Sequence, residues 1–291
     1  MRRSRPSWAG WWFVGPFMIV FTLVLIVPLL YAIYLSLFRD TLVGGTHFVG
    51  LENYALALQD PKFWDATIRV VVFLCIQVPI MLVLALTAAL ALDSARLRFV
   101  PFYRLSIFLP YAVPGVVAVM IWGYMYGDQF GLVADLNRWL DGIVPSPLSD
   151  TFIMTAIGNI VTWEFVGYNM LIFFAALQAI PQELYEAAEI DGAGAFRTVF
   201  SIKIPGIRGA IVVATIFSII GSFQLFNEPA VLQNIAPNVI TSYFTPNLYA
   251  FNLSFAGSQF NYAAAIAIVS GVITMIIAFF AQSMGMKEDK R

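Results

Sequence analysis

The stretch that joins two long apolar segments of this chain reads AIPQELYEAAEIDGAGAFRTVFSIKIP over residues 179–205. Its first part predicts a short helix, because Pro181 suits a first helical turn and apolar side chains recur three and four residues apart. Gly192 predicts a break, since glycine is favoured just beyond a helix end. A second short helix is predicted over about residues 195–203, and Pro205 would end it. The stretch therefore predicts two helices joined by a turn.

The apolar character of the whole chain indicates a membrane protein. Of the 291 residues, 60% are hydrophobic and 11% are charged, and the mean hydropathy is +0.82. Soluble domains are roughly 45–50% apolar and about 25% charged, so a soluble domain of this composition would expose large apolar patches. The net charge of −1 gives no indication of nucleic-acid binding. One cysteine and one histidine leave no disulfide framework and no zinc cluster.

Six segments are long and apolar enough to cross a bilayer, which takes about 20 residues of helix. They cover roughly residues 12–37, 68–92, 103–126, 151–178, 209–233 and 262–284. We therefore predict an all-α polytopic membrane protein with six transmembrane helices, in which residues 1–291 form a single domain. Residues 234–261 contain two prolines and several asparagines, which predicts a structured outer loop or a re-entrant segment.

The distribution of lysine and arginine predicts that both termini are cytoplasmic, because cytoplasmic loops carry an excess of these residues. With both termini inside, the inner side holds twelve of the sixteen: Arg2, Arg3, Arg5, Arg96, Arg98, Arg104, Arg197, Lys203, Arg208, Lys287, Lys290 and Arg291. The outer side keeps Arg39, Lys62, Arg69 and Arg138. This orientation puts the loop at residues 179–208 in the cytoplasm.

The loop resembles the EAA loop of binding-protein-dependent ABC importer permeases. Its Glu186-Ala187-Ala188 is followed by three residues, Gly192, nine residues and then Ile202-Lys203-Ile204-Pro205, which is the spacing of that family. Ile204 stands where the family usually has leucine, a change that conserves side-chain volume. The resemblance implies that ATPase coupling involves Glu186, Ala187, Ala188, Asp191, Gly192, Ile202 and Pro205.

The resemblance also implies a fold and a set of partners. The fold is the type I transmembrane domain of an ABC importer, whose first loop helix, here about residues 182–191, docks into a groove on an ATPase. The chain contains no G-x-x-x-x-G-K-[ST] sequence, so we expect a separate ATPase and a non-catalytic role for this chain. The implied partners are a second, different permease, two cytoplasmic ATPase subunits that hold ATP and Mg, an extracytoplasmic solute-binding protein and membrane lipid. We expect no cofactor on this chain, and a multi-pass location in the plasma membrane of a prokaryote.

Other stretches resemble the carbohydrate-uptake, maltose-type branch of the family. They include Gly50-Leu51-Glu52-Asn53-Tyr54, Pro110 and Pro114 in the third span, and Leu177-Gln178-Ala179-Ile180-Pro181. The resemblance implies half of an alternating-access pathway for a di- or oligosaccharide or a related sugar. Two alternatives are a permease for a non-sugar solute and a self-sufficient secondary transporter, although the inverted repeats common in secondary transporters are not evident.

Polar residues at membrane depth are costly and therefore indicate candidate positions on a transport pathway. In the fourth span the candidates are Glu164, Gly167, Tyr168 and Asn169, and in the fifth they are Gly221, Gln224, Leu225, Asn227 and Glu228. Spacings of three and four predict that Gly221, Gln224 and Glu228 share one helical face. The alternative is that these side chains hydrogen-bond between helices, with Glu228 at the outer interface.

Overall fold

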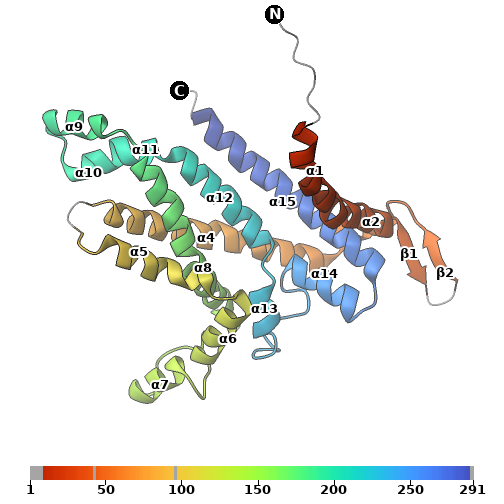
Figure 1. The fold of residues 1–291 in the computed structure, drawn as a ribbon. Helices are drawn as coiled ribbons and strands as arrows, with labels where there is room; N and C mark the ends of the chain where they lie inside the picture. The colour runs from red at the N-terminus through yellow and green to blue at the C-terminus, as the bar shows by residue number, and fades with distance from the viewer. Residues whose placement is uncertain (1–8, 42–43, 95–96, 289–291) are drawn as a thin grey trace, which may run out of the picture.

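The structure is a computed structural model that describes residues 9–41, 44–94 and 97–288, most of which lie in helices (Figure 1). The long helices are α4 (Pro61–Leu92), α8 (Ile153–Gln178), α12 (Arg208–Phe223) and α15 (Phe260–Glu288). The first span is built from α1 (Ala9–Phe21), the π-helical η1 (Thr22–Ile26) and α2 (Val27–Ser36). The elements between these include β1 (Phe38–Thr41), β2 (Gly45–Phe48), α3 (Glu52–Gln59), α5 (Val100–Phe108), η2 (Leu109–Ala112), α6 (Gly115–Met125), α7 (Leu132–Trp139) and α14 (Pro246–Phe255).

Five helical segments are long and apolar enough to cross a membrane: Trp11–Ser36, Pro61–Leu92, Ile153–Gln178, Arg208–Leu232 and Phe260–Gly285. They correspond to five of the six predicted spans, although the second begins at Pro61 rather than near residue 68. A bent pair of helices, Val100–Ala112 and Gly115–Met125, makes a sixth if the pair crosses as one span. The helical, multi-span fold class is therefore confirmed.

The third predicted span, residues 103–126, is two helices rather than one. The part formed by α5 and η2 meets α6 at an angle of 96°. Val113 has an extended backbone, with φ −78° and ψ 129°, and Pro114 follows it directly before α6. A proline disfavours helical backbone at the residue before it, so the helix ends there and restarts in a new direction. The prediction of one helix is corrected at this point.

A two-stranded hairpin follows the first span, where the sequence predicted an outer loop. Strands β1 and β2 pair antiparallel with Phe38 opposite Phe48, and the two ring centroids are 5.3 Å apart. The buried Asn53 of α3 donates to the carbonyl oxygens of Ser36 and Phe38, at 2.8 and 2.7 Å. These hydrogen bonds hold α3 against the end of α2.

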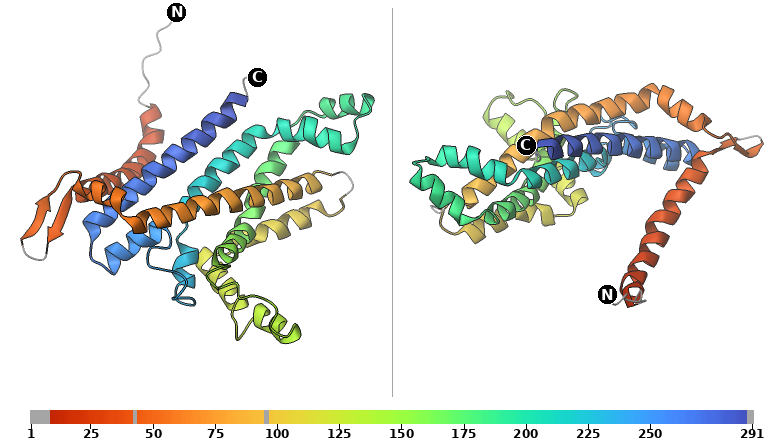
Figure 2. Two further views of the ribbon diagram at one scale, coloured as in Figure 1. Left: turned by 180° about the vertical axis from the view of Figure 1, so that it is seen from behind. Right: turned by 90° about the horizontal axis from the view of Figure 1, so that it is seen from above.

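The long helices α4, α8, α12 and α15 pack into one bundle from which α1 stands apart (Figure 2). Helix α4 packs along α8 and against α12, while α15 packs against α12, α14 and α2. Phe73 of α4 is buried in the core together with Ile157 and Ile160, which lie in the first turns of α8. By contrast, no part of the most apolar window of the first span is buried. The start of α1, the end of α15 and the loop after α8 lie toward the same end of the molecule (Figures 1 and 2).

Candidate transport pathway and coupling loop

The loop between α8 and α12 contains the first helix and the break that the sequence predicted. Helix α9 (Gln182–Ile190) begins directly after Pro181, and the Ala193 amide donates to the Ala188 carbonyl oxygen at 2.8 Å across its end. Gly192 has a φ of +74°, in the left-handed region that residues with a Cβ rarely adopt. Glycine therefore allows the chain to turn sharply after α9.

The second helix of the loop runs through Pro205 instead of ending before it. Helix α10 (Ala195–Thr198) passes into a π-helical turn, η3 (Val199–Lys203), and then into α11 (Ile204–Gly206). The amide that follows η3 bonds to the carbonyl five residues back, which widens the helix. The wider turn avoids the clash that a proline ring makes with the preceding turn of an α-helix. The prediction that Pro205 ends this helix was wrong for that reason.

The predicted coupling residues form an outer surface of this loop. Five of them are exposed and two are half-buried: Glu186, Ala187, Asp191, Gly192 and Pro205 are exposed, and Ala188 and Ile202 are half-buried. Two large apolar side chains extend this surface, with Ile190 86% exposed and Phe196 79% exposed. Exposed apolar side chains grouped in this way are typical of a surface that another protein covers.

The fifth span is interrupted where the sequence predicted a continuous helix. Helix α12 stops before residues 224–226, and α13 (Asn227–Leu232) begins after them. Pro229 has no amide hydrogen for the carbonyl four residues earlier, that of the buried Leu225. The Thr245 hydroxyl donates to this carbonyl oxygen instead, at 2.9 Å. Three residues predicted to share one helical face therefore do not: Gly221, Gln224 and Glu228.

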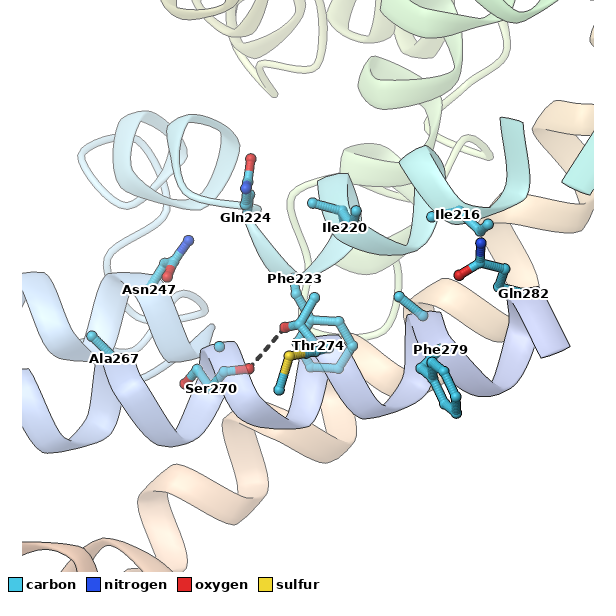
Figure 3. Close-up of a pocket in the computed structure, with 13 residues that line it drawn as sticks. Ile216, Ile220, Phe223, Gln224, Asn247, Ala267, Ser270, Thr274, Phe279 and Gln282 are labelled. Atoms are coloured by element: carbon cyan, nitrogen blue, oxygen red, sulfur yellow. Dashed lines mark hydrogen bonds between the residues drawn. The ribbon is translucent and has the colours of Figure 1, made fainter. Parts of the chain in front are cut away.

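A cavity of about 540 Å³ lies between α12 and α15, beside the start of α14 (Figure 3). Gln224 lines it from the interrupted span, and Asn247 lines it from α14. On α15, the Ser270 and Thr274 hydroxyls donate to carbonyls of their own helix at 2.8 Å, which leaves their oxygen lone pairs available to a ligand. The ring of Phe279 contributes an aromatic surface. The cavity thus combines polar groups with apolar walls.

The polar face of α15 was not among the predicted pathway residues. Ser270, Thr274 and Gln282 are spaced by four and eight residues, so they fall on one side of the helix. Small residues such as Gly271 lie between them and leave room for the cavity. The available signal was this regular spacing of polar and small residues within an otherwise apolar span.

Three candidates of the fourth span lie inside the bundle rather than along this cavity. Gly167 lies where α8 touches the end of α5, and a Cβ there would clash with the Ile107 carbonyl oxygen. Tyr168 stacks on Tyr111, with ring centroids 4.9 Å apart. Asn169 is 3% exposed and donates to a carbonyl of its own helix at 3.1 Å. These contacts favour a packing role for all three.

Glu164 and Glu228, which the sequence identified separately, come together with Asn227 at the first turn of α6. A Cβ on Gly115 would lie 3.2 Å from Glu164 Oε1 and 3.3 Å from Asn227 Nδ2. Glu164 and Glu228 are 6% and 7% exposed, so Glu228 is buried within the chain. The positive end of the α6 dipole favours negative charge here. No group of three His, Cys, Asp or Glu side chains that could hold a metal occurs in the described part of the chain.

Comparison with known proteins identifies the class. Residues 54–285 match the family described as binding-protein-dependent transport system inner membrane component. The lactose transport system permease protein LacF of Rhizobium radiobacter is 34% identical over 279 residues, covering 93% of this chain and 91% of that protein. The sulfoquinovosyl glycerol transport system permease protein SmoG of Agrobacterium fabrum is 32% identical over 289 residues, covering 94% and 92%.

A solved structure has the same fold. One chain in the crystal structure of a bacterial alginate ABC transporter, in complex with its alginate pentasaccharide-bound periplasmic protein, superimposes with a TM-score of 0.84. The match covers 96% of this chain and 94% of that one, at 18% sequence identity. The family match, the long alignments with permeases and the multi-span helical fold agree, and this chain belongs to the family of binding-protein-dependent inner-membrane transport permeases.

Proposed function

We propose that this permease moves a di- or oligosaccharide, or a related sugar, along a pathway to which the cavity between α12 and α15 contributes one wall. The observation that carries the proposal is the cavity lining, in which Gln224 and Asn247 supply amides and Ser270 and Thr274 supply hydroxyl oxygens. Sugar hydroxyls hydrogen-bond to such groups, while their C–H faces pack on aromatic rings such as that of Phe279. The transport of lactose and of a sulfoquinovosyl glycerol by the two relatives supports this substrate class.

Energy would come from ATPase subunits that are separate chains. ATP and Mg would bind to those subunits, and this chain would carry neither a cofactor nor a catalytic group. The exposed surface of α9 and the turn at Gly192 supports docking there, because Glu186 supplies charge and Ile190 and Phe196 supply apolar contact area. The excess of lysine and arginine in the inner segments supports a cytoplasmic position for this loop and for both termini.

A second permease would complete the membrane part of the transporter. The first span supports this, because its N-terminal part, α1, stands apart from the bundle with large apolar side chains exposed: Trp12 is 83% exposed and Phe13 86% exposed. An extracytoplasmic binding protein would deliver the sugar to the opposite end of the molecule. Its presence is supported by the family description and by the periplasmic protein in the alginate transporter complex.

The test is transport by the reconstituted assembly. Proteoliposomes would contain this chain, its second permease and its ATPase, with the binding protein and a radiolabelled disaccharide outside and ATP inside. We expect disaccharide accumulation that requires both ATP and the binding protein. Accumulation that continues without ATP would instead identify a secondary transporter, and ATP-dependent uptake that a panel of sugars does not compete with would identify a non-sugar solute.

A further inference from the structure

A mostly buried ion pair ties the loop after α8 to the ends of two transmembrane helices. Asp93 directly follows α4, and its carboxylate accepts from Lys203 Nζ at 2.5 Å and from Gln178 Nε2 at 2.6 Å. Lys203 is the last residue of η3, and Gln178 is the last residue of α8. Three elements that are distant in the sequence therefore meet at one carboxylate.

Burial distinguishes this ion pair from the other three in the described residues. The side chains of Lys203 and Asp93 are 15% and 10% exposed, whereas each of the others has at least one partner more than half exposed. Exposed ion pairs contribute little, but a buried one must make good the cost of removing two charges from water. Asp93 also lies at the negative end of the α4 dipole, which is unfavourable for a carboxylate. The ammonium of Lys203 offsets both costs only while the loop stays close enough to the end of α4 for the two charges to remain in contact.

Lys203 also contacts the coupling helix. Its Nζ lies 5.5 Å from the centroid of the Tyr185 ring on α9, within range of a cation–π interaction. The Tyr185 hydroxyl is buried and has no hydrogen-bond partner among the described residues. Burial, together with the negative charge of Asp93, raises the pKa of Tyr185, so the phenol stays neutral. Helix α9 is therefore packed onto the cation of the ion pair.

We propose that Asp93 and Lys203 are positioning residues that transmit the movement of α9 to α4 and α8. This inference rests on the proposed coupling of α9 to an ATPase. The backbone joins α9 to α8 and α12 through the non-helical residues 179–181 and the turn at Gly192, so neither connection is a continuous helix. The ion pair adds a link to α4, to which the loop has no direct backbone connection. Because α4 packs against both α8 and α12, a displacement that reaches α4 spreads through the bundle.

The experiment compares variants in the assembled transporter and measures sugar imported per ATP hydrolysed. D93N and K203Q each remove one charge, and the double variant D93N/K203Q removes both, so that it buries no unpaired charge. We expect the double variant to assemble and to hydrolyse ATP, with sugar per ATP lowered about fivefold, in the range by which residues of a coupling network change coupling. K203R keeps the charge and can still donate to Asp93, so its ratio should stay within about twofold of wild type.

The matched control is D65N, which makes the same change in the more exposed Arg69–Asp65 ion pair on the same helix. Its sugar-to-ATP ratio should equal that of the wild type. A double variant that keeps the wild-type ratio, or one that fails to assemble while D65N assembles, would overturn the transmitting role. The wild-type transporter tests the proposed function separately. If it imports sugar with ATP, the proposed function stands whatever the variants do, and if it imports none, both the proposed function and the transmitting role are overturned.

Discussion

Asp60 is a single carboxylate that holds three helices together at the end of the molecule opposite the loop after α8 (Figure 1). It caps α4 by accepting from the Lys62 amide at 2.9 Å, and it accepts from the hydroxyls of Tyr249 on α14 and Tyr262 on α15 at 2.6 and 2.8 Å. Burial alone would raise the pKa of Asp60, but the hydrogen bonds from these tyrosines and from the backbone outweigh it and lower the pKa. The carboxylate is therefore ionised and paired at neutral pH.

This lowered pKa predicts a pH-dependent contribution to stability. A group whose pKa is lower in the folded state stabilises at neutral pH, and the stabilisation is lost as the pH falls below about 4 and through the folded pKa. Asp60→Ala should lower the free energy of unfolding by about 2 kcal/mol at pH 7, from the lost cap and two charge-assisted hydrogen bonds. Thermal unfolding in detergent at pH 7 and pH 3 checks this. A difference from wild type that is equally large at pH 3 would contradict it.

Gly167 is a second residue whose role can be tested separately from transport. Any Cβ at this position meets the backbone of Ile107, so Gly167→Ala should cost about 1–3 kcal/mol of stability through overpacking. Gly209→Ala is the control, because a Cβ there has no neighbour within 4 Å. The melting temperature in detergent should fall for the first variant and stay unchanged for the second. An unchanged melting temperature with a raised KM for uptake would instead favour a place on the transport pathway.

At the scale of elements, α9 and the turn after it carry the most specific prediction. Glu186→Lys reverses an exposed charge on α9, and Gly192→Pro forbids the positive φ of the turn. Both should lower ATP-dependent uptake about tenfold or more while the chain remains in the membrane, because only the docking surface is altered. Asp150→Lys, an exposed charge reversal before the other end of α8, is the control. Uptake and the amount of chain in membranes would be measured together. Undiminished uptake by both loop variants would contradict the coupling role.

The sequence predicted the elements of this fold better than their interruptions. Long apolar runs located the spans, because the bilayer demands about 20 apolar residues whatever the neighbours are. The break before α13 was missed even though Pro229 signals it, because the break also needs Thr245, twenty residues away, to satisfy the Leu225 carbonyl. The continuation of the helix through Pro205 was missed for a related reason. A π-helical turn differs from an α-helical one only in which backbone carbonyl each amide bonds to, and the spacing of residue types does not indicate this.

The candidate site was predictable to the same limited extent. Among the candidate pathway residues of the fourth and fifth spans, Gln224 lines the cavity, while Gly167 and Tyr168 pack within the bundle. A polar residue at membrane depth must have a polar environment, but that environment can be either a transport pathway or a hydrogen-bonded contact between helices. Which of them applies depends on tertiary packing. The meeting of Glu164 with Glu228 likewise depends on how α6, α8 and α13 converge.

At the scale of the whole molecule, the chain has the features expected of one subunit of a larger assembly. The first span stands apart with its apolar surface exposed, and the cavity lies between α12 and α15. The loop between α8 and α12, for which we propose the coupling role, extends from one end of the bundle (Figure 1). The cavity wall and the exposed loop surface are not covered within a single subunit, so its activity is expected to depend on assembly.

The cavity gives the prediction that tests this view of the whole molecule. Gln224→Ala removes an amide from the cavity wall, and loss of one or two hydrogen bonds to a sugar should cost about 1–2 kcal/mol, which raises the KM for uptake roughly five- to thirtyfold. The side chain is exposed in this subunit and lies outside its core, so copurification with the partner subunits should be unchanged. Gln129→Ala, another exposed glutamine but far along the chain in a different cavity, is the control and should leave the KM unaltered. If Gln224→Ala instead weakened copurification and transport in parallel, Gln224 would belong to the contact between the two permeases, and the sugar pathway would have to lie elsewhere in the assembly.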